Sequence, residues 1–263
     1  MNLTEIIAEL NRISSPKKAA ILQKFFKTGK GQYAENEIFI GIEIPKLRNI
    51  AKKLVKEIVP KNTMLSPYNF QQNLLLDSTK EAIFFLLDSN IHEQKILAIL
   101  ILLEIIAKDD STKTLEEISN FYLEPQILNN INNWDLVDLS CHKIIGKDLY
   151  ISPSKKDILY QLALSKNFWH RRIAIVSTLY FIRHNSFADT IKISQILLKD
   201  QEPLINKACG WLLREVGKKS IADLESFVES NIGNIPAITL SYLCEKMSHS
   251  QRLGYQQRNK SQK

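Results

Sequence analysis

The 263-residue chain contains only 8 glycines, 8 prolines and 3 cysteines. So few turn-forming residues argue against an all-β fold, in which short strands alternate with tight turns. Cys141, Cys209 and Cys244 are far apart, and no Cys-x-x-Cys pair or Cys/His cluster has the spacing of zinc ligands. A small, odd number of cysteines is typical of buried thiols in a reducing compartment, so we expect a cytoplasmic protein without a metal site.

Long hydrophobic runs and enzyme signatures are missing as well. The most apolar run, residues 96–106, is interrupted by Glu104 and is too short to span a bilayer, which predicts a buried helix and no membrane partner. The first 20 residues lack the apolar core of a signal peptide. There is no Walker loop, Gly-x-Gly-x-x-Gly, Gly-x-Ser-x-Gly or His-Glu-x-x-His motif, so we expect no cofactor.

Apolar residues do recur at helical spacing along nearly the whole chain, and no segment alternates convincingly as a strand would. This pattern predicts an all-α fold. Two of the predicted helices begin at Pro16 and Pro45. Further helices are predicted over about residues 67–76, 79–87, 91–107, 112–123, 131–149 with a possible break, 153–164, 168–183, 187–198, 203–217, 220–230 and 235–247.

Three of these segments resemble one another, namely Glu93–Glu104, Trp169–Tyr180 and Ile205–Val216. Each has a Lys or Arg shortly before an alanine and an apolar run, at spacings loosely compatible with HEAT repeats. We therefore expect one HEAT-like helical repeat solenoid over residues 1–247, whose concave surface would suit duplex DNA. Residues 248–263 are polar and basic without an acid, and we expect a disordered tail.

Charge is distributed unevenly along the chain. Residues 1–60 hold 11 Lys/Arg against 6 Asp/Glu, and residues 166–219 hold 10 against 4. Between them, residues 61–165 hold 9 against 14. Two basic segments that flank an acidic one are compatible with a polyanion lying against both, which gives the expected groove its basic character. Ordinary solvated helix faces are the alternative.

A first candidate constellation is Asn133-Trp134-Asp135-Leu136-Val137-Asp138. On a helix, Trp134 and Asp138 are four residues apart and share a face. An indole can pack on a deoxyribose while a carboxylate stabilises positive charge that develops on the sugar when an N-glycosidic bond breaks. The alternative is a core tryptophan with Asp135 as a helix cap.

Two further constellations pair tryptophan with basic residues. In Phe168-Trp169-His170-Arg171-Arg172, the aromatic ring and two arginines suit phosphate binding. In Lys207-Ala208-Cys209-Gly210-Trp211-Leu212-Leu213-Arg214-Glu215, Trp211 and Arg214 share a face, and Gly210 indicates a close approach by a ligand or another helix. The alternatives are core tryptophans, surface ion pairs and tight helix packing.

The fourth constellation is Phe39-Ile40-Gly41-Ile42-Glu43-Ile44-Pro45-Lys46-Leu47-Arg48. It is a loop that opens a helix with Lys46 and Arg48 in the first turn, where cations oppose the helix dipole. A phosphate bound at that helix terminus would explain them. Exposed charge without a ligand is the alternative.

Together these stretches resemble the DNA alkylation repair enzyme family of the AlkD type. The resemblance covers about residues 20–245 and runs through Gly41-Ile42-x-x-Pro45-x-Leu47-Arg48, Trp134-Asp135-x-Val137-Asp138, Trp169-x-x-Arg172 and Lys207-Ala208-x-Gly210-Trp211-x-Leu213-Arg214-Glu215. Asn133 stands where some members carry a second tryptophan.

The resemblance implies a monomeric DNA glycosylase of HEAT-like repeats that excises N3- and N7-alkylated purines, such as 3-methyladenine and 7-methylguanine, from double-stranded DNA as the first step of base excision repair. It implies catalytic roles for Asp138, Trp134 and Arg172. Trp211 would pack on the lesion's sugar and backbone. Further DNA contacts would come from the remaining basic and aromatic residues of the motifs, namely Arg214, Trp169, Arg171, Lys207, Lys46 and Arg48.

Two alternatives stay open at this stage. One is a DNA-binding protein of the same fold that does not catalyse excision, although Trp134, Asp138 and Arg172 together argue against it. The other is a HEAT-like protein scaffold without a nucleic-acid role. It would show no strongly salt-dependent DNA binding.

Overall fold

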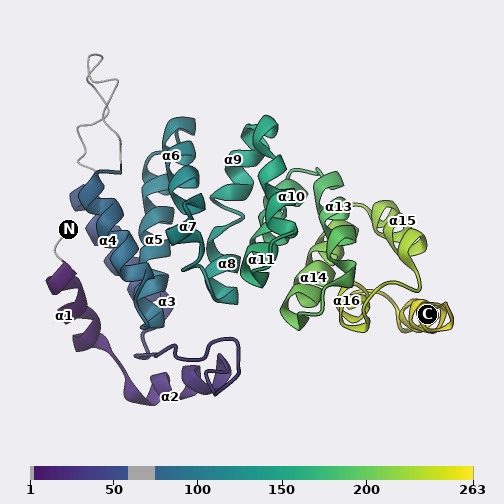
Figure 1. The fold of residues 1–263 in the computed structure, drawn as a ribbon, viewed down its shortest axis with the longest axis horizontal. Coiled ribbons are helices and arrows are strands. Elements are labelled where there is room, and N and C mark those ends of the chain that lie inside the picture. Colours follow the sequence, from purple (N-terminus) through teal and green to yellow (C-terminus); the bar gives the residue numbers. More distant parts are fainter. Residues whose placement is uncertain (1–2, 59–74, 263) are drawn as a thin grey trace. The chain divides into compact units, whose positions relative to one another are not determined.

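The computed structural model describes residues 3–58 and 75–262 (Figure 1). Within these ranges the chain is helical, and the β-type pairing is limited to an isolated bridge between Ile38 and Ile91. The predicted all-α fold is therefore confirmed. The chain divides into two compact units, Met1–Leu136 and Val137–Lys263, here called the N-terminal and the C-terminal unit. Neighbouring parts of one repeat array can divide in this way, so the single domain over residues 1–247 stays a prediction.

The N-terminal unit is built around helix α5, His92–Lys108. Both α3 and α4 pack against this helix. Its apolar residues face all directions and are almost all buried, as a helix surrounded by other elements requires. The other helices of the unit are α1 (Leu3–Ile13), α2 (Pro16–Phe25), α3 (Ile44–Ile58), α4 (Asp77–Leu87), α6 (Thr112–Leu123), α7 (Pro125–Leu128) and the start of α8 (Trp134–Ser140).

The C-terminal unit is built around helix α14, Pro203–Lys219, which packs against α11, α13, α15 and α16. Pro203 opens this helix, and the Glu202 carboxylate caps it by accepting from the Leu204 amide. The other elements are α9 (Ile145–Ile151), α10 (Asp157–Ala163), α11 (Phe168–Ser177), α12 (Leu179–Arg183), α13 (Ala188–Ile196), α15 (Ile221–Asn231), α16 (Ala237–Leu243), α17 (His249–Ser261) and the short 3₁₀ helices Pro153–Lys155 and Leu197–Lys199.

Gly210 lies where α14 meets α16. A Cβ atom at this position would lie 2.5 Å from Tyr242 Cβ and 2.6 Å from the Thr239 carbonyl oxygen. Both distances are too short for a real contact, so only glycine allows the two helices to pack this closely. Helix packing, one of the two explanations open from the sequence, accounts for Gly210.

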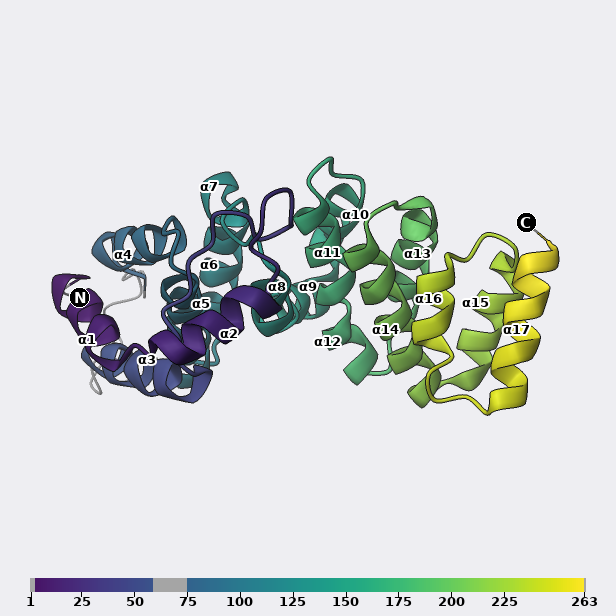
Figure 2. The ribbon, with the colours of Figure 1, turned by 90° about the horizontal axis from the view of Figure 1, so that it is seen from below.

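The prediction of a disordered tail over residues 248–263 was wrong for residues 249–261, which form helix α17. Ser248 and Gln251 start this helix with a reciprocal capping box. Asn259 then holds the helix against the preceding loop, because it accepts from the Gly233 amide at 2.8 Å and donates to the Ile235 carbonyl at 2.9 Å. Figure 2 shows α17 beside α15 and α16.

Two other predictions concern where helices begin and end. The predicted helix over residues 67–76 falls almost wholly outside the described residues. The predicted helices over 131–149 and 168–183 are each interrupted, the first between α8 and α9 and the second at Thr178. None of the helices in the described part of the chain is long and apolar enough to cross a membrane.

Candidate functional site

The Asp138 carboxylate is held by a two-point ion pair inside the C-terminal unit. Arg172, on α11, donates from Nε to Asp138 Oδ1 at 3.0 Å and from Nη2 to Oδ2 at 2.8 Å. Its Nη1 donates to the Leu204 carbonyl at 2.6 Å, at the start of α14. The Arg172 side chain is 7% exposed and that of Asp138 is 23% exposed. A planar guanidinium with three such contacts fixes the orientation of the carboxylate while part of it stays accessible to solvent.

Helix α11 is held in place by the residues at its N-terminus. The Asn167 side chain caps it by accepting from the Trp169 amide at 2.9 Å. Arg171 pairs with Asp200 through two hydrogen bonds of 2.6 and 3.0 Å, and also donates to the Ser165 carbonyl at 2.9 Å. Arg171 thus makes the surface ion pair that was the alternative to phosphate binding.

Trp169 is buried against Phe168, with ring centroids 4.3 Å apart. Its exposed fraction is 6%, as the core alternative predicted. Little of the ring is therefore left to contact DNA. The expectation that Trp169 contacts DNA is therefore corrected: Trp169 is a buried residue of α11 that packs in the core of the unit.

Neither of the buried cysteines nearest the Asp138–Arg172 pair is suited to act as a nucleophile. Burial raises the pKa of the Cys141 thiol far above its usual range, and it raises that of Cys209 to about 12. Both thiols therefore stay protonated at neutral pH, and the thiolate is the reactive form. Part of the Asp138 carboxylate, by contrast, is accessible to solvent.

Helix α14 carries the predicted residues Lys207, Trp211 and Arg214. Trp211 and Lys207 are half-buried, so part of each side chain is accessible. The guanidinium of Arg214 hydrogen-bonds to Glu245 and lies 3.8 Å from Glu215. It therefore has acidic partners within the protein, as one alternative predicted, and its contact with DNA stays a prediction.

Trp134 begins α8 in the N-terminal unit and belongs to an aromatic cluster. Its ring stacks on Phe26 with centroids 5.2 Å apart and planes 11° apart, and the exposed Phe25 contacts it edge-on at 6.2 Å. The indole Nε1 donates to the Tyr33 hydroxyl at 3.1 Å. Because the residue is half-buried, these contacts orient the ring without covering it completely.

A buried cluster of charged side chains lies next to these rings. His92 Nε2 is 2.8 Å from Asp135 Oδ2, and its Nδ1 is 3.3 Å from Glu37 Oε2. Lys95 Nζ is 3.6 Å from the other Glu37 oxygen and donates to Asn132 at 2.8 Å. Burial by itself lowers the His92 pKa, but the two carboxylates outweigh it and raise this pKa to about 9. His92 is therefore a buried cation at neutral pH.

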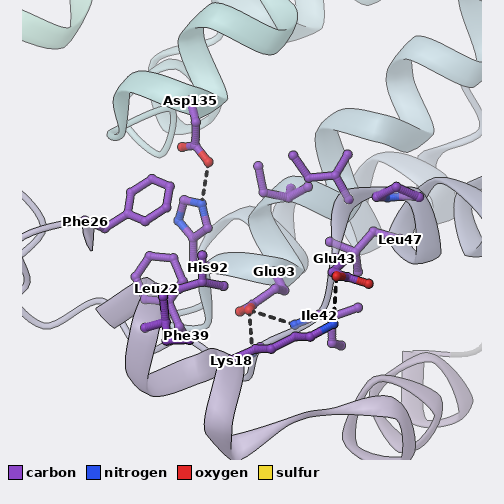
Figure 3. A pocket seen from close by; sticks show the side chains of 15 residues that line it. Lys18, Leu22, Phe26, Phe39, Ile42, Glu43, Leu47, His92, Glu93 and Asp135 are labelled. Carbon is purple, nitrogen blue, oxygen red and sulfur yellow. Dashed lines mark hydrogen bonds and ion pairs between the residues drawn. The ribbon is translucent and has the colours of Figure 1, made fainter. Parts of the chain in front are cut away.

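His92 and Asp135 also line a cavity of about 510 Å³ (Figure 3). Its walls are mostly apolar and come from α2, the loop before α3, and α5. Glu93, next to His92, accepts from the amides of Ile40, Gly41 and Ile42 at 2.7–3.2 Å. This carboxylate fixes the loop that leads into α3.

The two cations predicted at the start of α3 differ in their surroundings. Lys46 is exposed, whereas Arg48 donates to Glu104 at 3.3 Å. A Cβ atom on Gly41 would lie 2.2 Å from the Ser15 carbonyl oxygen, and its φ of 79° also favours glycine. Loop geometry thus explains Gly41, and phosphate binding by Lys46 and Arg48 stays a prediction.

The structure therefore brings Asp138 and Arg172 into direct contact, and Trp134 precedes Asp138 by four residues on α8. Sequence reasoning missed Glu37, His92 and Lys95. The available signal was a run of polar residues, His92 to Lys95, at the start of a helix that is otherwise apolar. In residues 3–58 and 75–262, no group of three or more His, Cys, Asp or Glu side chains is arranged to hold a metal ion.

Comparisons with known proteins identify a family for the chain. A family model described as DNA alkylation repair enzyme matches residues 6–247. A solved structure described as a predicted DNA alkylation repair enzyme from Enterococcus faecalis is similar with a TM-score of 0.66. The two chains are 19% identical, and the match covers 90% of this chain and 97% of the other. A search of curated proteins found no match.

Proposed function

Since the chain belongs to the DNA alkylation repair enzyme family, we propose that it is a DNA glycosylase that excises N3- and N7-alkylated purines from duplex DNA. The observation that carries this proposal is the ion pair of Asp138 with Arg172, in which a carboxylate is oriented at two points and still partly accessible. A carboxylate of this kind can stabilise a sugar that becomes cationic.

The chemistry of the leaving group explains why one carboxylate suffices. An N3- or N7-alkylated purine carries a positive charge and departs as a neutral base, so no general acid has to protonate it. As the glycosidic bond breaks, positive charge develops at the anomeric carbon, and Asp138 stabilises that charge and orients the attacking water. The water oxygen bonds to the anomeric carbon and loses one proton to solvent.

We assign further roles to Arg172 and to the two accessible tryptophans. Arg172 keeps the Asp138 carboxylate in one orientation, so its effect on the reaction passes mainly through that contact. Trp134 and Trp211 offer indole surface to the sugar and backbone of the lesion nucleotide. Lys46 and Lys207 add positive charge for the phosphates.

The proposal is tested by release of 7-methylguanine from methylated duplex DNA. Asp138→Asn keeps the size of the side chain and removes its charge, so we expect excision to fall about 10²–10³-fold while duplex affinity is retained. Asp157→Asn, the same change at an exposed position on α10, is the matched control and is expected to retain activity.

Salt-dependent duplex binding without any release of base by the wild-type protein would instead support the non-catalytic DNA-binding alternative. Equal activity of the Asp138→Asn variant and the wild type would refute the role given to Asp138. The expected monomer is checked in the same preparation by its sedimentation mass.

A further inference from the structure

We propose that the buried charge cluster of Glu37, His92, Lys95 and Asp135 positions the Trp134 indole for the reaction, with His92 as the central positioning residue. The catalytic part of this inference rests on the function proposed above. The structural part does not, because it concerns only how the N-terminal unit holds the start of α8.

Both neighbours of Trp134 in the chain are tied to the cluster. Asn133 donates to Glu37 Oε2 at 2.5 Å, and its own side-chain oxygen accepts from the Trp134 amide at 2.8 Å. On the other side, Asp135 accepts from the Leu136 amide at 2.8 Å while its second oxygen is bound to His92. The first turn of α8 is therefore held by the side chains of Asn133 and Asp135, and both of these are bound to the cluster residues Glu37 and His92.

The rings are connected to the cluster as well. The imidazole of His92 stacks on Phe39 with centroids 4.5 Å apart and contacts Phe26 at 5.0 Å. Phe26 in turn stacks on Trp134, whose Nε1 is held by Tyr33. One series of contacts thus runs from His92 through Phe26 to the indole. The backbone of Trp134 is held by Asn133, which is bound to Glu37 of the same cluster.

The charges of the cluster balance one another. Two carboxylates, Glu37 and Asp135, face two cations, His92 and Lys95, in a region that excludes most water. Replacing one member with a neutral residue leaves a buried charge without its partner, and the remaining groups must move or take up water. The first turn of α8 is attached to those groups, so its residues are expected to move with them.

The first measurement follows the indole N–H signals in a ¹H–¹⁵N NMR spectrum. The chain has three tryptophans, so three signals are expected, and Trp134→Phe assigns one of them. In His92→Ala we expect the Trp134 signal to shift or broaden while the signals of Trp169 and Trp211 stay in place. His184→Ala, which changes an exposed histidine on the C-terminal unit, should leave all three unchanged.

The cavity allows a second measurement by chemical rescue. Because His92 lines this cavity, imidazole added at millimolar concentration can enter the space that His92→Ala leaves. We expect His92→Ala to lower the single-turnover rate of excision about 10–100-fold, the range that a small misplacement of a contacting group produces. Added imidazole should restore most of that rate and return the Trp134 signal toward its wild-type position.

An unmoved Trp134 signal in folded His92→Ala would overturn the proposal, and so would equal movement of all three indole signals or a shifted signal at wild-type rate. Should His92→Ala fail to fold, the isosteric Asp135→Asn gives the same test. A wild-type protein that releases no base defeats the proposed function, and the selective movement of the Trp134 signal still decides whether the cluster positions it.

Discussion

Two carboxylates on the short helix α8 have different partners. Asp135 belongs to the N-terminal unit and Asp138 to the C-terminal unit. Asp135 is bound to a histidine and belongs to a charge cluster beside a cavity. Asp138 is bound to an arginine and is the more exposed of the two, at 23% against 14%. Arginine stays charged at any relevant pH, whereas a histidine can lose its proton. The comparison separates a carboxylate suited to a constant electrostatic role from one whose surroundings depend on pH.

The largest expected effect separates the two carboxylates by function. Asp138→Asn should lower single-turnover excision about 10²–10³-fold, and it should also lower the midpoint of thermal unfolding because the buried Arg172 loses its carboxylate. Asp135→Asn should lower the midpoint as well, with a smaller loss of activity. Equal losses of activity in the two variants would remove the distinction between them.

A second prediction concerns Arg172, whose charge does not change with pH. Arg172→Ala leaves Asp138 without its cation and the Leu204 carbonyl without a donor, so we expect a loss of about 3 kcal/mol of folding free energy together with weaker excision. Urea unfolding of the wild type and the variant measures this loss. A variant as stable as the wild type would mean that the Asp138–Arg172 pair contributes little to the unit.

The third prediction uses the raised pKa of His92, which is about 9 in the folded chain against an ordinary value of 6.5. A raised pKa stabilises the fold fully below pH 6.5, and this contribution is lost as pH rises through 9. We expect a decline of about 3 kcal/mol over that window. Thermal unfolding at several pH values should show the decline in the wild type and a flatter profile in His92→Gln.

Lys95 and Glu37 lie beside His92, and their pKa values are shifted as well. Burial lowers the pKa of Lys95, and a base whose pKa is lowered by folding gives a contribution that rises with pH. Burial raises the pKa of Glu37, but the hydrogen bond with His92 and the charges of His92 and Lys95 outweigh burial and lower this pKa, so the contribution of Glu37 to stability is lost only in acid. The difference between wild type and His92→Gln therefore isolates the histidine. Parallel profiles of the two proteins would contradict its assignment as a buried cation.

The smallest expected effect compares the basic surfaces of the two units. Lys46→Ala and Lys207→Ala each remove one accessible ammonium group, one from each unit. If each contacts a phosphate, either change should lower duplex affinity a few-fold and reduce the slope of log affinity against log salt by about 1. Titrations at two salt concentrations measure this slope. A change in only one variant would place the DNA contact on that unit alone.

The sequence predicted the helical fold because apolar periodicity is a local signal. It also marked Asp138 and Arg172, but their contact joins residues 34 positions apart, and spacing along the chain carries no information on it. His92 escaped notice for the same reason, since its partner Glu37 lies in a loop far from it in sequence. Helix α17 was missed because its composition is polar, and what orders it is a capping box and the bonds of a single buried asparagine.

All three cysteines of the chain belong to the C-terminal unit, and all are buried. A thiol reagent can therefore react only when that unit opens locally. Cys141 follows α8 directly, Cys209 lies on α14, and Cys244 ends α16. The rates at which the native protein is labelled would thus report the opening of three separate places in the C-terminal unit, while the N-terminal unit, which contains no cysteine, gives no labelling.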